Sequence, residues 1–162
     1  MLTRKIWLAL TALLLVAPAC AKDFTGVGEG IDPATFELRT INGQNIPVTA
    51  VIRGTTRIEI ISGTFKIEST YQFTNSTTYR RTENGTVSTV TENCVGTYDP
   101  TFTNNGITTL AFSENGADNT QCGVQLSPTG VGGRTRNYPG TWNGSNTLTA
   151  DFDITTHSVY SK

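Results

Sequence analysis

Thr147-Leu-Thr-Ala-Asp-Phe-Asp-Ile154 alternates strictly between polar and apolar side chains. In an extended chain, Leu148, Ala150, Phe152 and Ile154 lie on one face, and threonine and aspartate occupy the other. This alternation is typical of a β-strand with one face in a core and the other in water. Shorter stretches with the same period occur at residues 36–38, 48–52, 58–60, 65–67 and 71–73. The pattern predicts a chain built from half-buried strands.

Asn-Gly pairs separate many of these stretches. The pair favours a two-residue hairpin turn, because both of its residues accept a positive φ. The five pairs are Asn42-Gly43, Asn84-Gly85, Asn105-Gly106, Asn115-Gly116 and Asn143-Gly144. The apolar face also switches between Ile60 and Phe65, which predicts a turn or bulge at Ile61-Ser62-Gly63. Successive strands should therefore run antiparallel.

These signals predict the fold class. We expect strands at about 36–42, 47–53, 57–67, 70–82, 86–93, 95–99, 107–113, 120–126, 139–142, 146–154 and 157–161, some of which merge. The fold is then all-β, an antiparallel up-and-down meander of about eight or nine strands closed as a barrel, with a β-sandwich as the alternative. The segment from Leu126 to Pro139 is rich in glycine and proline and predicts a long exposed loop.

The N-terminus has the organisation of a bacterial export signal. Arg4 and Lys5 precede an apolar run from Ile6 to Val16, and small residues follow. The run is too short to span a bilayer, which takes about 20 apolar residues. The sequence therefore divides into a signal peptide, a flexible tether and one domain. Their expected ranges are 1–21, 22–34 and 35–162.

Two interpretations of the cleavage site stay open. In one, Cys20 becomes the lipid-bearing first residue of a lipoprotein, although Pro18 departs from the usual motif. In the other, cleavage follows Ala21 and Cys20 leaves with the signal. In both, export to an oxidising compartment predicts a disulfide between Cys94 and Cys122. The expected location is the bacterial cell envelope, lipid-anchored at the outer membrane, or else the periplasm or the medium.

The mature chain is slightly acidic. The sequence holds 12 Lys and Arg and 13 Asp and Glu residues, and two of the basic ones lie in the signal. A nucleic-acid-binding face needs a strong basic excess, so nucleic acid is not an expected partner. Contact with a membrane would go no further than a lipid anchor at Cys20.

Several segments resemble small lipocalin-like β-barrel domains of exported bacterial lipoproteins. Phe36-Glu-Leu-Arg-Thr-Ile-Asn-Gly43, followed by Ile46-Pro47, is similar to their first strand, turn and second strand. Gly-x-Trp, which typical lipocalins carry on the first strand, occurs here as Gly140-Thr-Trp142 near the C-terminus. Further similar segments are Ile61–Ile67, Thr91–Tyr98, Asn146–Phe152 and Val159–Lys162.

The resemblance implies a non-enzymatic envelope protein that binds a small apolar ligand. It does not identify that ligand. The alternative is a filled-core structural or interaction module that presents its loops to a protein or glycan. An eight-stranded barrel is wide enough either to be filled by side chains or to hold one small ligand. A cavity on the order of several hundred Å³ would favour binding. Its expected aromatic lining is Tyr71, Phe73, Tyr98, Phe112, Trp142 and Phe152.

No catalytic, metal or cofactor site is expected. His157 is the only histidine, so the chain has no Ser-His-Asp or Cys-His combination unless that residue serves alone. Zinc is not expected because Cys-x-x-Cys pairs are absent. Asp151 and Asp153 share a strand face that we expect to be solvated. The sequence does not predict an oligomeric state.

Overall fold

The computed structural model describes residues 31–68, 70–115, 136–153 and 156–162. Within them, every regular element is a β-strand. The strands are β1 (Ala34–Ile41), β2 (Gln44–Asn45), β3 (Val48–Arg53), β4 (Thr56–Ile67), β5 (Gln72–Glu83), β6 (Thr86–Asn104), β7 (Ile107–Glu114), β8 (Arg136–Trp142), β9 (Thr147–Asp153) and β10 (Thr156–Ser161). No helix in this part of the chain is long and apolar enough to cross a membrane.

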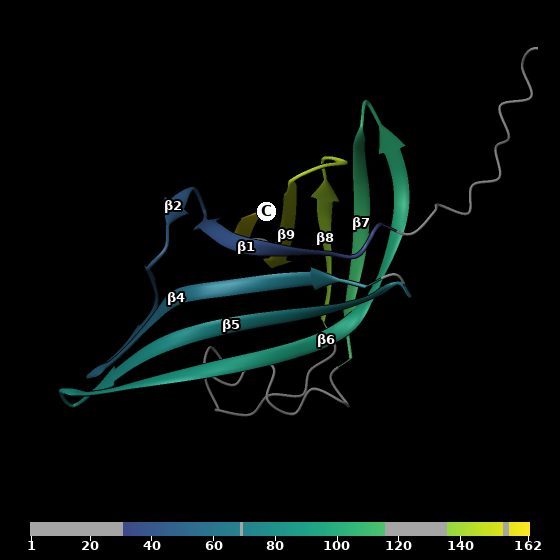
Figure 1. The fold of residues 1–162 in the computed structure, drawn as a ribbon. Helices are drawn as coiled ribbons and strands as arrows, with labels where there is room; N and C mark the ends of the chain where they lie inside the picture. Colours follow the sequence, from purple (N-terminus) through teal and green to yellow (C-terminus); the bar gives the residue numbers. More distant parts are fainter. Residues whose placement is uncertain (1–30, 69, 116–135, 154–155) are drawn as a thin grey trace, which may run out of the picture.

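The strands form one antiparallel sheet in the order β2-β1-β10-β9-β8-β7-β6-β5-β4-β3, and β1 also pairs with β4. This additional pairing closes eight strands into a barrel and leaves β2 and β3 outside the ring (Figure 1). Around the ring from β4 to β10, each strand pairs with its neighbours in sequence. The fold is therefore the all-β, lipocalin-like up-and-down barrel that the strands and turns predict, and it is not a sandwich.

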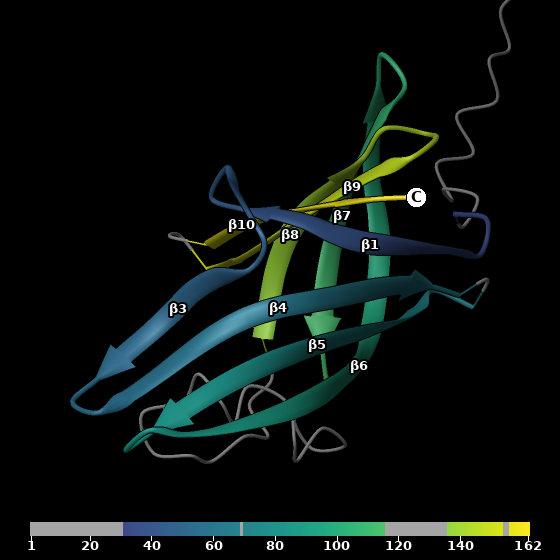
Figure 2. The same ribbon diagram turned by 60° about the vertical axis from the view of Figure 1, so that its left-hand side comes forward.

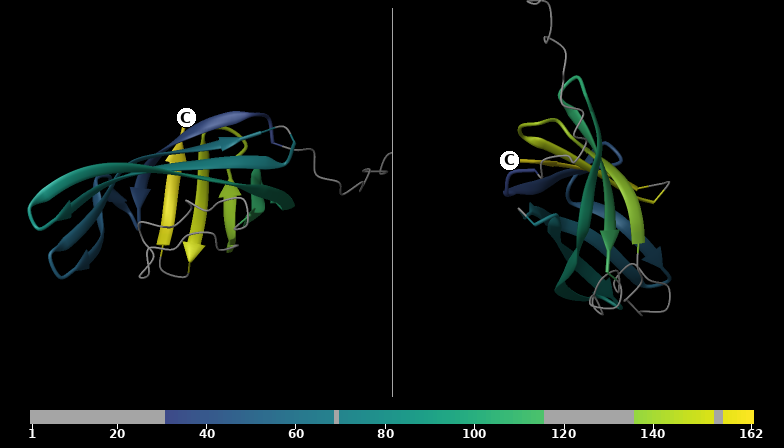
Figure 3. Two further views of the ribbon diagram at one scale, coloured as in Figure 1. Left: turned by 90° about the horizontal axis from the view of Figure 1, so that it is seen from below. Right: turned by 90° about the vertical axis from the view of Figure 1, so that its right-hand side faces the viewer.

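The two ends of the barrel differ because β1 and β4 pair over only part of their length. Ala34–Glu37 of β1 pairs with the end of β4. Beyond it, Thr40 and Ile41 pair with β2, whereas the beginning of β4 pairs with β3. The wall is continuous where β1 begins, which we call the closed end, and it parts between β2 and β3 at the other end, which we call the mouth (Figure 2). On the mouth side, β4, β5 and β6 extend beyond β8, β9 and β10 (Figure 3).

Aromatic rings fill the barrel toward the closed end. Phe65 lies among them, with its ring centroid 4.8 Å from that of Phe73, 5.0 Å from Phe112 and 5.5 Å from Tyr160. All four side chains are almost completely buried. Stacked and edge-to-face ring pairs at such distances add to the stabilisation from burial. This part of the interior is packed rather than hollow.

Two glycines make room for these rings. A Cβ at Gly96 would come within 2.7 Å of the Phe73 ring, and a Cβ at Gly140 within 2.6 Å of the Phe112 ring. Each would also collide with a backbone carbonyl oxygen of the neighbouring strand. The rings therefore lie directly against the barrel wall, and a larger residue at either glycine would displace one of them.

Residues before β1 cover the closed end. Ile31, which the sequence places in the tether, is buried in the core cluster. The Tyr98 hydroxyl donates to the carbonyl oxygen of Glu68 at 3.2 Å and lies 3.5 Å from that of Ile31. The Tyr98 N–H donates to the carbonyl oxygen of Tyr71, whose φ of +59° is uncommon for a bulky residue. The packed part of the domain thus includes Ile31.

Asn-Gly turns connect the strands largely as the sequence predicts. Both residues have positive φ at Asn42-Gly43, Asn84-Gly85 and Asn105-Gly106. At Asn143-Gly144 only the glycine does, and the Asn143 Oδ1 accepts hydrogen bonds from the backbone N–H groups of residues 145–147. Asn115-Gly116 extends outside the described residues. The irregularity expected near Ile61 is confirmed by a register shift in the pairing of β4 with β5.

Some strand boundaries differ from those predicted. β6 is one strand where the sequence predicts two, at 86–93 and 95–99, because its pairing with β5 continues without a register shift through Cys94. Pro139 lies inside β8 and pairs with Ala111, so the predicted loop does not reach it. Ile52 of β3 is 72 % exposed, because this edge strand lies outside the ring. The strand predicted at 120–126 lies outside the described residues.

Candidate functional site: a pocket at the barrel mouth

The inward side chains of β5 change character along the strand. From the closed end toward the mouth they are Phe73, Asn75, Thr77 and Tyr79. In the pairing of β4 with β5, Asn75 lies opposite Phe65, the ring on which the aromatic packing converges. The interior therefore turns from aromatic to polar at Asn75.

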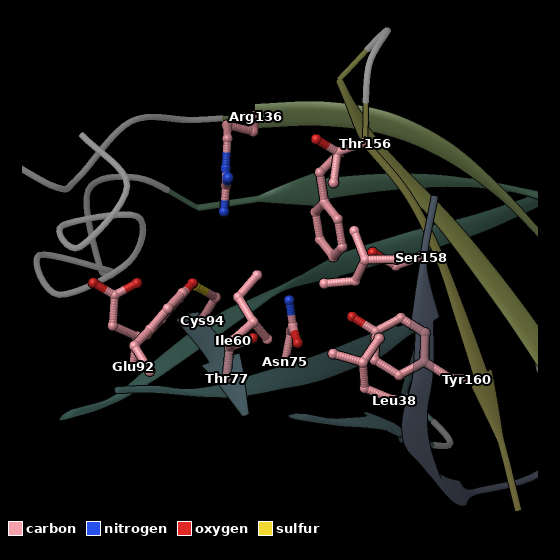
Figure 4. Close-up of a pocket in the computed structure, with 13 residues that line it drawn as sticks. Leu38, Ile60, Asn75, Thr77, Glu92, Cys94, Arg136, Thr156, Ser158 and Tyr160 are labelled. Atoms are coloured by element: carbon pink, nitrogen blue, oxygen red, sulfur yellow. The ribbon is translucent and has the colours of Figure 1, made fainter. Parts of the chain in front are cut away.

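A pocket of about 90 Å³ opens from this level toward the mouth (Figure 4). Its apolar lining consists of Leu38, Ile41, Ile60, Tyr79, Cys94, Phe152 and Tyr160. Its polar lining consists of Asn75, Thr77, Glu92, Arg136, Thr156 and Ser158. Seven strands contribute: β1, β4, β5, β6, β8, β9 and β10. The pocket is therefore amphipathic, and it depends on the closed barrel rather than on one hairpin.

Asn75 provides an unsatisfied polar group in this pocket. Its side chain is 5 % exposed, and its Oδ1 has no hydrogen-bond partner. Buried polar atoms are nearly always hydrogen-bonded, and one left alone costs roughly 1–3 kcal/mol. The carboxamide is directed into the pocket, across from Ser158 and Tyr160 (Figure 4). A ligand that donates a hydrogen bond here would supply the missing partner.

Arg136 enters the pocket with its charge already compensated. Its Nε and one terminal nitrogen donate to the Oε2 of Glu114 at 2.7 and 2.6 Å, and Glu114 is completely buried. The Tyr138 hydroxyl donates to the Oε1 of the same carboxylate at 3.0 Å. The Arg136 guanidinium also lies 5.8 Å from the ring centroid of Phe152. These contacts fix the arginine and use both oxygens of Glu114.

The tyrosines of the pocket remain neutral hydroxyl groups. Burial raises the pKa of Tyr79 and of Tyr160 well above the usual value of about 10. The charge of Glu92 raises the pKa of Tyr79 further. A hydrogen bond with Ser158 acts in the opposite direction on Tyr160 without offsetting the burial. The two phenols therefore offer hydrogen bonding without charge.

The six aromatic residues predicted to line a cavity separate into three groups. Phe152 lines the pocket. Phe73, Tyr98 and Phe112 belong to the packed core, and Trp142 packs against it half-buried. Tyr71 is exposed beside Tyr98 at the closed end. Aromatic residues at strand positions thus fill this barrel more than they line its cavity.

One of the three cysteines, Cys94, lines the pocket. Cys94 is part of a disulfide, whose other half is outside the described residues. Cys20 and Cys122 both lie outside them, so the pairing of Cys94 with Cys122 and the lipidation of Cys20 stay predictions.

His157 is exposed on β10, and its Nδ1 contacts the Asp151 carboxylate. This pair lies on the outer surface and does not line the pocket. Among the described residues, no three His, Cys, Asp or Glu side chains gather closely enough to hold a metal ion.

Sequence inspection missed Asn75 and Thr77 because β5 is rich in polar residues on both faces. The stretch Gln72–Glu83 contains four threonines, and nothing in composition separates an inward threonine from an outward one. The parity of Asn75 with Phe73 and Tyr79 is the signal that could have identified it. A polar residue at an apolar period is a candidate for an inward polar group.

No protein-family model matches the chain, and no curated protein or solved structure shows a significant similarity to it.

Proposed function

We propose that this protein is a non-enzymatic, lipocalin-like binding protein of the bacterial cell envelope that holds one small ligand in the mouth of its barrel. The observation that carries the proposal is the mouth pocket, in which an apolar wall faces a buried acceptor without a partner. Ligand sites are typically concave and mostly apolar, with a few polar groups that fix orientation. The mouth pocket has this composition.

The size of the pocket limits the ligand. Drug-sized molecules occupy pockets of about 300–1,000 Å³, whereas this one measures about 90 Å³ and is smaller than the cavity expected from the sequence for a binding barrel. The rings around Phe65 fill the rest of the barrel, so a long acyl chain has no room inside. The ligand therefore inserts an end group, and the remainder of the molecule lies along the apolar wall toward the mouth.

Residence in the envelope rests on the N-terminal sequence. The basic start, the short apolar run and the small residues around Cys20 support export. If Cys20 carries the lipid, labelled fatty acid enters the protein and Cys20→Ala releases it from membranes. A mature N-terminus at Lys22 would contradict lipidation and leave export intact.

A blocked-pocket variant tests ligand binding. Thr77→Phe places a ring in the pocket, whereas Thr78→Phe places the same ring on the outer face, where Thr78 now contacts Thr91 at 3.0 Å. Native mass spectrometry of protein purified from the envelope should show a bound small molecule in the wild type and in Thr78→Phe, and none in Thr77→Phe. Equal occupancy in both variants would contradict a site at the mouth.

A filled-core interaction module is the second candidate function. Two exposed apolar residues at the mouth-side tips favour it: Ile52 is 72 % exposed and Val87 is 60 % exposed. The register joins them in one row across β3, β4, β5 and β6, through Arg57 and Thr82. Replacing both by serine should abolish cross-linking to a partner in the envelope and leave ligand occupancy unchanged, if this row is the functional surface.

A further inference from the structure

We infer that Asn75 is the specificity-determining residue of the mouth pocket and selects a neutral end group, a hydroxyl or a carboxamide, over a carboxylate. This inference rests on the proposed function and names the ligand class for the same site. It starts from the position of Asn75, whose backbone pairs with Phe65 on β4 and with Cys94 on β6. Neighbours on both sides hold the carboxamide at the level where the packed core ends.

The groups that face Asn75 are neutral. Across the pocket lie the hydroxyls of Ser158 and Tyr160 (Figure 4). Ser158 is almost completely buried, and burial keeps the Tyr160 phenol protonated by raising its pKa. A carboxamide and two hydroxyls can exchange hydrogen bonds with an end group that both donates and accepts.

The pocket offers little to an anion. Among the described residues that line it, the one cation is Arg136, which is already bound to Glu114 through two of its nitrogens. Glu92, a second buried carboxylate, also lines the pocket. A ligand carboxylate would have to lose its water shell near these acidic groups and compete with Glu114 for the guanidinium, which is unfavourable.

The acceptor at Asn75 favours end groups that donate a hydrogen bond, in addition to the unfavourable environment that the pocket presents to anions. Its Oδ1 has no partner within the protein, so a ligand hydroxyl or amide N–H gains a hydrogen bond without breaking one inside the protein. An end group that only accepts leaves this atom unsatisfied. Sites built to hydrogen-bond a donor reject analogues that lack it, because the buried partner stays unpaired.

A matched octyl series tests the inference. Affinities of the full mature domain for octanol, octanamide and octanoate are measured by calorimetry at neutral pH. We expect the neutral pair to bind about tenfold or more tightly than octanoate. Asn75→Leu should weaken octanol and octanamide by about two- to tenfold, which corresponds to one neutral hydrogen bond, and so reduce the preference. Asn75→Asp should weaken octanoate further by adding a negative charge.

Controls separate the possible failures. Asn93→Leu changes an exposed asparagine on β6 next to Cys94 and should alter no affinity. Asn75→Leu should fold, because it removes an unpartnered polar group, and a melting temperature at or above that of the wild type confirms this. Equal affinity for octanoate, or an unchanged preference in Asn75→Leu, would overturn the inference and leave the proposed function standing. No binding of any member by the wild type, with no effect of Thr77→Phe on occupancy, would overturn both.

Discussion

The closed end and the mouth of the barrel share the same strands but differ in what the inward side chains do. Toward the closed end, Phe65, Phe73 and Phe112 pack ring against ring, and glycines bring those rings against the wall. Toward the mouth, the same strands present Asn75, Thr77, Glu92 and Arg136 around a pocket, along with apolar side chains. Contacts at the closed end are mainly between rings, whereas the mouth pocket includes a buried acceptor without a partner, the Asn75 Oδ1.

The difference shows how one small barrel can combine a packed core with a polar pocket. Buried rings contribute most to the free energy of unfolding, and unsatisfied polar groups reduce it. By concentrating the rings at one end, the chain tolerates a polar and partly hollow region at the other. The packed core and the proposed binding site thereby lie at different levels of the barrel.

The largest expected effect is at the closed end. Phe65→Ala removes a fully buried ring that contacts three others and should lower the free energy of unfolding by about 3–5 kcal/mol. Ile60→Ala, beside the pocket, should cost less, about 2 kcal/mol, because the site is already partly hollow. Urea unfolding measures both. A larger loss for Ile60→Ala would contradict the conclusion that the closed end contributes more to stability than the mouth.

Removing the charge of Glu114 should have the next largest effect. Glu114→Gln keeps an acceptor for Tyr138 but leaves Arg136 without its buried counterion, which should cost about 2–3 kcal/mol in the same assay. Glu59→Gln is the matched control, because Glu59 binds Arg57 and Arg80 on the outer face. Its effect should be clearly smaller. Equal losses would show that the position of the carboxylate inside the barrel does not matter.

Alkaline pH should destabilise the protein through its buried tyrosines. Burial raises the pKa of Tyr79, Tyr138 and Tyr160 above the value of about 10 for an unfolded chain. Their contribution is complete below that pH and is lost as the pH rises above it, because the unfolded state releases the protons first. Absorbance at alkaline pH should show these phenols ionising together with unfolding, and Tyr160→Phe should reduce the pH dependence. Ionisation in the folded state would contradict their burial.

Acid pH should produce the smallest effect, on the outer face. The hydrogen bond from Arg80 lowers the pKa of Glu59 despite an opposing effect of burial. The stabilisation is present above the unfolded pKa of about 4.3 and is lost as the pH falls through the lower folded value. Urea midpoints between neutral and acid pH should therefore fall less steeply in Glu59→Gln. An identical pH dependence would show that this outer-face cluster contributes nothing measurable.

Much of the fold could be predicted from the sequence, because local signals determine hairpins. Asn84-Gly85 fixes the turn between β5 and β6, and the alternation in Thr147–Ile154 identifies β9. The site was less predictable. Asn75 shares its parity with Phe73 and Tyr79, but the many polar residues on both faces of β5 obscure that signal, and the register then places it opposite Phe65. The sequence does not show that Gly96 makes room for a ring, because that ring, Phe73, lies on another strand.

Because the wall parts between β2 and β3, local opening of the barrel should begin at the mouth. Hydrogen exchange is the measurement that detects such opening. These two strands are the margins of the described sheet, and β2 contributes two residues. The β3 strand can detach from β4 without breaking a hydrogen bond of the eight-stranded ring. Amides of β3 should therefore exchange before those of β5 and β9, and opening should proceed from the mouth while the closed end keeps its protection.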